Sequence, residues 1–148
     1  MEPRFPSYIC KLQLKVGSYN VQGQGKKSQV KLRKIKNLFT RGGFDIFLLQ
    51  ETRSDGSEKE LKRWQKVFNT KQIFLTSFGS NAVGVGIVIK SEEDFTVHRY
   101  FKDPLGRYVG VIGDHEEGKF LILSFYSPSI EQVVTTNADC VLSSHDVS

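Results

Sequence analysis

Residues 12–20 alternate apolar and polar side chains, which predicts a β-strand with one buried face. A polar loop with two glycines follows, and Ser28 is then a good N-cap for a helix. The apolar residues behind it recur at helical spacing: Leu32, Ile35, Leu38 and Phe39. A glycine pair at 42–43 is expected to end this helix, so the chain opens with a strand and an amphipathic helix.

A nearly continuous apolar run at 44–50 predicts a second strand, buried on both faces. The order strand, helix, strand is typical of a parallel crossover unit. A second helix is expected after Ser57, which can form a capping box with Glu60. The apolar stripe of this helix is Leu61, Trp64, Val67 and Phe68, and we interpret Trp64 as a core residue.

Beyond the second helix the pattern changes to short strands separated by turn-like segments. The expected strands are 72–77, 83–90, 95–101, 107–113 and 119–126. This succession predicts an antiparallel meander. After residue 130 the periodicity is weak, and no convincing element is predicted there.

The composition is that of a globular domain, with 39% hydrophobic and 25% charged residues in 148. No apolar run reaches the length of about 18 residues that a membrane span requires, so no membrane partner is expected. The first residues do not resemble a secretory signal. Two cysteines at opposite ends indicate neither a zinc site nor a disulfide framework. We therefore expect an intracellular protein, in the nucleus or cytoplasm, that is not secreted.

The net charge of +5 is concentrated in one basic run without an acidic residue. Its members are Lys26, Lys27, Lys31, Arg33, Lys34, Lys36 and Arg41. One interpretation is a solvated helix face, and the other is a surface for a polyanion such as DNA. In the second case Lys26, Lys27, Lys31 and Lys34 are the candidate nucleic-acid contacts.

Polar residues close the first two predicted strands, Asn20 on the first and Glu51 on the second. In open α/β sheets, ligands gather at the carboxyl ends of strands. An amide and a carboxylate at one sheet edge can hold Mg²⁺, which prefers oxygen ligands and keeps several waters. The ordinary alternatives are a turn former for Asn20 and a charge near a helix N-terminus for Glu51.

Five segments between residues 16 and 128 share the order and spacing of known motifs. They are 16–23 (VGSYNVQG), 45–52 (DIFLLQET), 83–89 (VGVGIVI), 106–109 (GRYV) and 121–128 (LILSFYSP). This series resembles the endonuclease/exonuclease/phosphatase superfamily. Within it, the chain is most similar to the endonuclease domain of LINE-type (non-LTR) retrotransposon polyproteins. The regions then expected are an N-terminal extension (1–11), the N-terminal half of such a domain (12–129) and a divergent or frayed tail (130–148).

The resemblance implies a role for several residues. Glu51 would be a direct ligand of Mg²⁺ or Mn²⁺, and Asn20 would orient the scissile phosphate or the water shell of the metal. Tyr126 would place its phenol near the phosphate, although it could instead be a core aromatic. Arg107 would be a phosphate contact or a packing residue. Ser129 stands where the family has an Asn, which leaves it as a weak phosphate contact.

Other family motifs are not found in the chain. No segment after Tyr126 matches the family's "GDFN" motif or its "SDH" motif, which position and activate the nucleophilic water. Ser144-His145-Asp146 has the letters of the second motif in another order, and we interpret it as unrelated. The resemblance thus predicts a fragment of a Mg²⁺-dependent phosphodiesterase of the DNA endonuclease type, with no activity alone.

The implied fold is α/β (α+β), part of a four-layer sandwich. The chain would supply one mixed sheet flanked by two helices, with the second sheet largely missing. An uncovered apolar sheet face would then favour self-association. The partners expected are DNA, RNA as a lesser possibility, and the missing C-terminal half or a downstream reverse transcriptase region. Two alternatives stay open: a non-catalytic nucleic-acid-binding fragment or retroelement remnant, and a small-phosphoester phosphatase of the same superfamily.

Overall fold

The computed structural model describes residues 14–21, 29–76, 84–90, 95–115, 118–125, 133–136, 141–143 and 145–146. Its helices are α2 (Gln29–Arg41) and α3 (Glu58–Phe68). Its strands are β1 (Val16–Asn20), β2 (Ile46–Gln50), β3 (Ile73–Leu75), β4 (Val85–Ile89), β5 (Phe95–Lys102), β6 (Tyr108–His115), β7 (Gly118–Phe125), β8 (Val133–Thr136), β9 (Val141–Ser143) and β10 (His145–Asp146).

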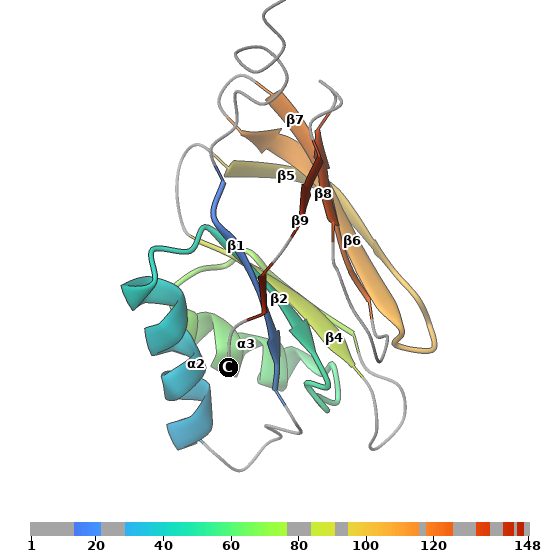
Figure 1. The fold of residues 1–148 in the computed structure, drawn as a ribbon. Helices are drawn as coiled ribbons and strands as arrows, with labels where there is room; N and C mark the ends of the chain where they lie inside the picture. Colours follow the sequence, from blue (N-terminus) through green and yellow to red (C-terminus); the bar gives the residue numbers. More distant parts are fainter. Residues whose placement is uncertain are drawn as a thin grey trace, which may run out of the picture.

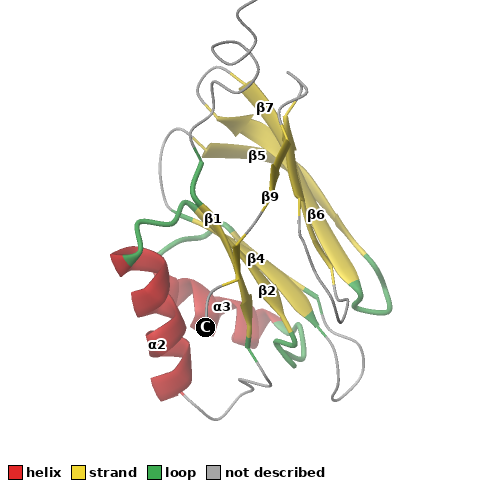
Figure 2. Cartoon of the chain, in the orientation of Figure 1, coloured by secondary structure: helices red, strands yellow, loops and turns green. Residues whose placement is uncertain are grey.

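The strands form two five-stranded sheets (Figure 1). The first sheet has the order β10-β1-β2-β4-β3 and is mixed, because β1 pairs in parallel with β2 and β10, whereas β4 is antiparallel to β2 and β3. The second sheet has the order β5-β6-β7-β8-β9 and is antiparallel throughout. Both helices lie on one side of the first sheet, and the second sheet lies on its other side (Figure 2).

Both helices form where the apolar spacing predicts them. Leu32, Ile35 and Phe39 are the buried face of α2. In α3 the side chain of Ser57 accepts a hydrogen bond from the backbone N–H of Glu60, as in the predicted cap, and the helix ends at a left-handed residue. The buried residues of both helices pack with β1, β2, β3 and β4 around Trp64, which is fully buried as predicted.

A second core lies between the two sheets. The first sheet contributes Val16, Ile46, Leu48, Val85, Ile87 and Ile89, and the second contributes Phe95, Val109, Val111, Phe120 and Ile122. The predicted α/β class, with a mixed sheet flanked by two helices, is confirmed. The expectation that the second sheet is largely missing is wrong, because β5, β6 and β7 form a sheet of their own that covers the inner face of the first.

The segment beyond residue 130 also differs from the expectation of no element. It contributes β8 and β9 to the second sheet and β10 to the first, with His145 beside Gly17 and Asp146 beside Ser18. These strands have four, three and two residues, which is too short for a period of two to stand out in the sequence.

Apolar side chains are exposed on the second sheet rather than on the first. Tyr100, Phe101, Tyr108 and Leu121 are each more than a third exposed, and all four belong to β5, β6 or β7. Within the described residues, neither helix is long and apolar enough to cross a membrane.

Candidate metal and phosphate site

Asn20 and Glu51 meet at the carboxyl ends of two parallel strands. The register pairs Asn20 with Gln50, and the Nδ2 atom of Asn20 donates to Oε2 of Glu51 at 2.5 Å. Directly beneath them, the buried hydroxyl of Ser18 donates to the side-chain oxygen of Gln50 at 3.2 Å. The two residues that the sequence places at one sheet edge therefore lie in contact, and a buried polar bond ties their strands together.

The loop after β2 holds Glu51 in an uncommon backbone conformation. Glu51 has a φ of 52° and Arg53 a φ of 49°, both in the left-handed region. Between them, Thr52 is fully buried and its N–H donates to the carbonyl of Gly84 at 3.0 Å. Gly84 has a φ of 104°, and a Cβ there would lie 2.7 Å from Oγ1 of Thr52. The position of Glu51 thus depends on close contact between two backbone segments. This contact requires glycine at position 84, directly before β4.

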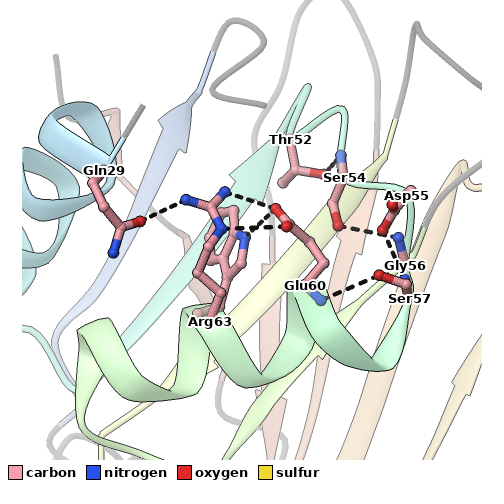
Figure 3. A network of polar contacts seen from close by, with 9 residues as sticks. Gln29, Thr52, Ser54, Asp55, Gly56, Ser57, Glu60 and Arg63 are labelled. Carbon is pink, nitrogen blue, oxygen red and sulfur yellow. Dashed lines mark hydrogen bonds and ion pairs between the residues drawn. The ribbon is translucent and has the colours of Figure 1, made fainter. Parts of the chain in front are cut away.

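A polar network joins the same loop to α3, and Arg63 of α3 in turn bonds to Gln29 of α2 (Figure 3). The N–H of Gly56 donates to Oγ of Ser54, which is itself buried. The buried carboxylate of Glu60 accepts hydrogen bonds from Nε and Nη2 of Arg63 and from the indole N–H of Trp64. Because the cap of α3 and this carboxylate sit on one helical turn, the loop that carries Glu51 continues into a well-anchored helix.

The electrostatics around Glu51 suit a cation. Its carboxylate is 23% exposed, and its Oε1 atom lies 3.8 Å from Nη2 of Arg53 in a loose ion pair. Within the described residues, no group of three or more His, Cys, Asp or Glu side chains gathers to form a metal cage. One carboxylate beside an amide fits a water-rich Mg²⁺, which needs only one or two carboxylates, and does not fit a closed zinc or calcium site.

The second sheet reaches the same region through β7. The buried hydroxyl of Ser124 donates to the carbonyl of Leu49 at 3.2 Å. Ser124 lies two residues before Tyr126, and Leu49 lies two residues before Glu51. Tyr126 and Ser129 are outside the described residues, so their predicted roles stay predictions.

Arg107 lies in the turn between β5 and β6 and is held by Asp103. Its Nε donates to Oδ2 of Asp103 at 2.5 Å, and its own N–H donates to the same oxygen at 3.2 Å. The N–H of Leu105 donates to the other carboxylate oxygen. The Arg107 side chain, through its hydrogen bonds, lowers the pKa of Asp103 below the ordinary range, and Asp103 raises the pKa of Arg107. Arg107 is 62% exposed, so its guanidinium still faces solvent.

The sequence pattern did not single out Asp103, Thr52 or Gly84. Asp103 precedes Pro104 in a segment already interpreted as a turn, and Asp is favoured at the first turn position, so that signal was available. The contact between Thr52 and Gly84 joins segments that are distant in sequence, and no local pattern reveals it.

The predicted nucleic-acid contacts are only partly visible. Lys26 and Lys27 lie outside the described residues. Lys31 and Lys34 lie on α2, where Lys31 is half-buried and Lys34 is exposed. Lys34 also lines a groove with Tyr19, Asn37, Leu38, Arg41, Gly42 and Phe44.

Comparison with known proteins agrees with this arrangement. A model of the Endonuclease/Exonuclease/phosphatase family matches residues 17–145. The chain belongs to this family. No curated protein matches the sequence.

Several solved structures share the fold. A truncated TDP2 of Caenorhabditis elegans is 18% identical with a TM-score of 0.57, over 79% of this chain and 47% of that one. The AP endonuclease LMAP of Leishmania major is 16% identical with a TM-score of 0.55, over 76% and 40%. A mannosyl-6-phosphatase of Bacteroides thetaiotaomicron is 16% identical with a TM-score of 0.51, over 75% and 50%. The chain therefore spans half or less of the length of each of these structures.

Proposed function

We propose that Asn20 and Glu51 form the metal half-site of a Mg²⁺- or Mn²⁺-dependent phosphodiesterase of the DNA endonuclease type. The observation that carries this proposal is their contact at 2.5 Å on the carboxyl ends of parallel strands. Glu51 would hold the metal through its carboxylate, with water filling the remaining positions. When bound, such an ion polarises a phosphate oxygen and stabilises developing negative charge.

The chain's own residues would bind and orient the phosphate. Asn20 presents an amide beside the Glu51 carboxylate, from which it can hold a phosphate oxygen or a metal-bound water. Arg107 offers an exposed guanidinium, although Asp103 already occupies part of its hydrogen-bonding capacity. The bond from Ser124 to β2 brings the end of β7 to the same region, and this supports a phosphate-facing role for Tyr126.

The substrate is part of the proposal. An AP endonuclease and a sugar phosphatase are both among the similar structures, so the fold by itself fits either a nucleic acid or a small phosphoester. We favour DNA because, within the superfamily that the five motifs resemble, the sequence is most similar to the endonuclease domain of LINE-type retrotransposon polyproteins. The chain's charge of +5 also suits a polyanion. The remaining half of such a domain, or a reverse transcriptase region, would be a partner in an intracellular setting.

We also propose that the chain alone turns over slowly or not at all. Residues 1–148 contain no match to the two motifs that would activate the attacking water. Loss of a positioned base typically lowers the rate by about 10²–10⁴-fold. The exposed apolar side chains of β5, β6 and β7 favour self-association, which sedimentation velocity over a range of concentrations would detect as an increasing average mass.

Metal binding gives the direct test of the half-site. Mn²⁺ titrated into the full chain is followed by calorimetry or by the electron paramagnetic resonance signal of free Mn²⁺. Glu51→Gln should abolish specific binding because it removes the only proposed charged ligand. Glu58→Gln is the matched control, since Glu58 is an exposed glutamate that pairs with Lys62 on α3. Equal Mn²⁺ affinity in the wild type and Glu51→Gln would remove Glu51 from the site.

A plasmid-nicking assay in Mg²⁺ tests the proposal that the chain alone has little or no activity. The expected result is no nicking above background by the wild-type chain. Robust nicking that Glu51→Ala abolishes would show that the chain carries a complete catalytic set. Nicking that survives Glu51→Ala would point to a contaminating nuclease.

A further inference from the structure

A cationic groove lies between α2 and α3, on the helical side of the first sheet. It has a volume of about 370 Å³ and is lined by Gln29, Arg33, Lys36, Asn37, Lys66 and Val67. Three of these six side chains are cations and none is an acid. Its walls are held together by Nη1 of Arg63, which donates to the side-chain oxygen of Gln29 at 2.6 Å (Figure 3).

The cations of this groove are not neutralised by the described part of the chain. Arg63 beside the groove is compensated by the buried carboxylate of Glu60, at 2.8 Å. Within the described residues, no hydrogen bond or ion pair engages the side chains of Arg33, Lys36 or Lys66. Three uncompensated positive charges around one polar groove repel one another, and an anion placed among them relieves that repulsion.

The opposite flank of α2 has the same sign. Lys34 and Arg41 line the neighbouring groove, and α2 contains no acidic residue over its 13 positions. Arg33, Lys34, Lys36, Arg41 and Lys66 are named here the α2 ridge. From Arg33 to Arg41 this ridge extends about 12 Å along the helix axis. Duplex DNA carries about seven phosphate charges over that length, so the ridge matches an extended polyanion better than a single phosphate.

The surroundings of the ridge favour nucleic acid over other anionic partners. A helix that lies on an anionic membrane presents large apolar residues beside its cations, whereas Leu32, Ile35 and Phe39 are buried against the sheet. A protein partner would need an apolar centre in its interface. The exposed face of α2 offers a single exposed apolar side chain, Val30 in its first turn.

We propose that the α2 ridge is a binding site for the phosphodiester backbone of duplex DNA. In this site, the side chains of Arg33, Lys36 and Lys66 bind phosphates in the α2–α3 groove. This site is formed by the helical layer and does not use Asn20, Glu51 or a metal. It binds without sequence preference, because its contacts are to phosphates rather than to base edges. Its role is to hold the polyanion on the protein whether or not the metal half-site is functional.

The test measures the salt dependence of binding by the full chain. Fluorescence anisotropy with a labelled duplex of arbitrary sequence is recorded at several KCl concentrations, in EDTA so that no divalent metal takes part. In the triple variant Arg33→Gln, Lys36→Gln, Lys66→Gln, the slope of log K against log salt should fall in magnitude by about 2–3. The affinity at about 0.1 M salt should fall about tenfold or more.

A charge-matched control variant distinguishes a localised DNA-binding site from a general effect of net charge on DNA affinity. The variant Lys71→Gln, Arg99→Gln, Lys119→Gln also removes one Arg and two Lys, all exposed and none lining the α2 ridge grooves. It should retain the wild-type slope. Equal loss in both triple variants, no loss in either, or no binding by the wild type at low salt would each overturn the proposal.

Two further measurements support the interpretation. Lys66→Gln alone changes one exposed side chain and should lower the slope by about 1, which covers the case in which the triple variant fails to fold. The triple variant should also keep the Mn²⁺ affinity of the wild type, because none of its three positions belongs to the metal half-site. Weaker DNA binding with retained Mn²⁺ binding therefore separates the α2 ridge from the metal half-site, and a wild type that binds no Mn²⁺ would overturn the half-site without affecting the DNA titration in EDTA.

Discussion

Replacing Gly84 by alanine should disturb the loop that carries Glu51. The new Cβ would lie 2.7 Å from Oγ1 of Thr52 and 3.2 Å from the carbonyl oxygen of Thr76, in a backbone with a φ of 104°. Strain at such a position costs about 1–3 kcal/mol. Weakening the hydrogen bond from the Thr52 N–H to the Gly84 carbonyl adds about 0.5–1.5 kcal/mol. We expect Gly84→Ala to lower the free energy of unfolding by about 2–4 kcal/mol.

Gly43→Ala provides the matched control. Gly43 also has a positive φ, of 67°, but its Cβ would meet nothing within 4 Å. Only the left-handed conformation is then penalised, at about 1–2 kcal/mol. Urea unfolding followed by circular dichroism measures both values, and Mn²⁺ titration of Gly84→Ala should also show weaker binding, because Glu51 adjoins Thr52. Equal destabilisation by the two substitutions would refute the close-approach argument.

A double-mutant cycle isolates the contact. Thr52→Ala removes the Oγ1 atom that the new methyl group would strike, so Thr52→Ala with Gly84→Ala should cost less than the sum of the two single changes. A coupling of about 0.5–3 kcal/mol is expected for residues in direct contact. Thr52→Val keeps a branched side chain of similar volume and should give no such relief. Strict additivity with Thr52→Ala would contradict the geometry.

Three other predictions concern the neighbourhood of the site. Arg53→Gln should tighten Mn²⁺ binding about two- to fivefold in calorimetry, because it removes a cation 3.8 Å from Glu51; weaker binding would count against a metal on that carboxylate. Asp103→Asn should lower the melting temperature above about pH 5, and the difference from the wild type should shrink below about pH 4, since Arg107 lowers the folded-state pKa and this stabilisation is lost as Asp103 protonates. A difference independent of pH would contradict this linkage. Ser124→Ala should lower the free energy of unfolding in urea by about 1 kcal/mol through loss of a buried hydrogen bond to β2, and an unchanged value would show that this bond adds nothing to stability.

Local patterns located most elements of the fold. The strands expected at 95–101 and 119–126 are β5 (Phe95–Lys102) and β7 (Gly118–Phe125), and the cap at Ser57 begins α3 as predicted. Periodicity identifies such elements because it reflects which face of each is buried. The sequence pattern failed on the assignment of strands to sheets, because pairing partners are distant along the chain and period alone does not choose between them.

In the candidate site, too, local patterns located some residues, whereas contacts between distant segments could not be predicted. The positions of Asn20 and Glu51 could be predicted because Asn20 ends β1, Glu51 follows β2, and parallel strands end at one edge. The parts that hold them could not, since Thr52 meets Gly84 and Ser124 meets Leu49 across long sequence separations. The α2 ridge was visible in part as a basic run, but Lys66 joins it only through the packing of α3 against α2.

The parallel pairing of β10 with β1 has a consequence for biosynthesis. Gly17 is among the first described residues to leave the ribosome. Its neighbour His145 leaves only after nearly all of the chain between them has been synthesised. At about 5–20 residues per second, this interval lasts roughly 6–25 s. During it the outer edge of β1 has no strand beside it, and an open edge can pair with another chain. The nascent protein is therefore most exposed to strand exchange while it is being made, on the very strand that carries Asn20.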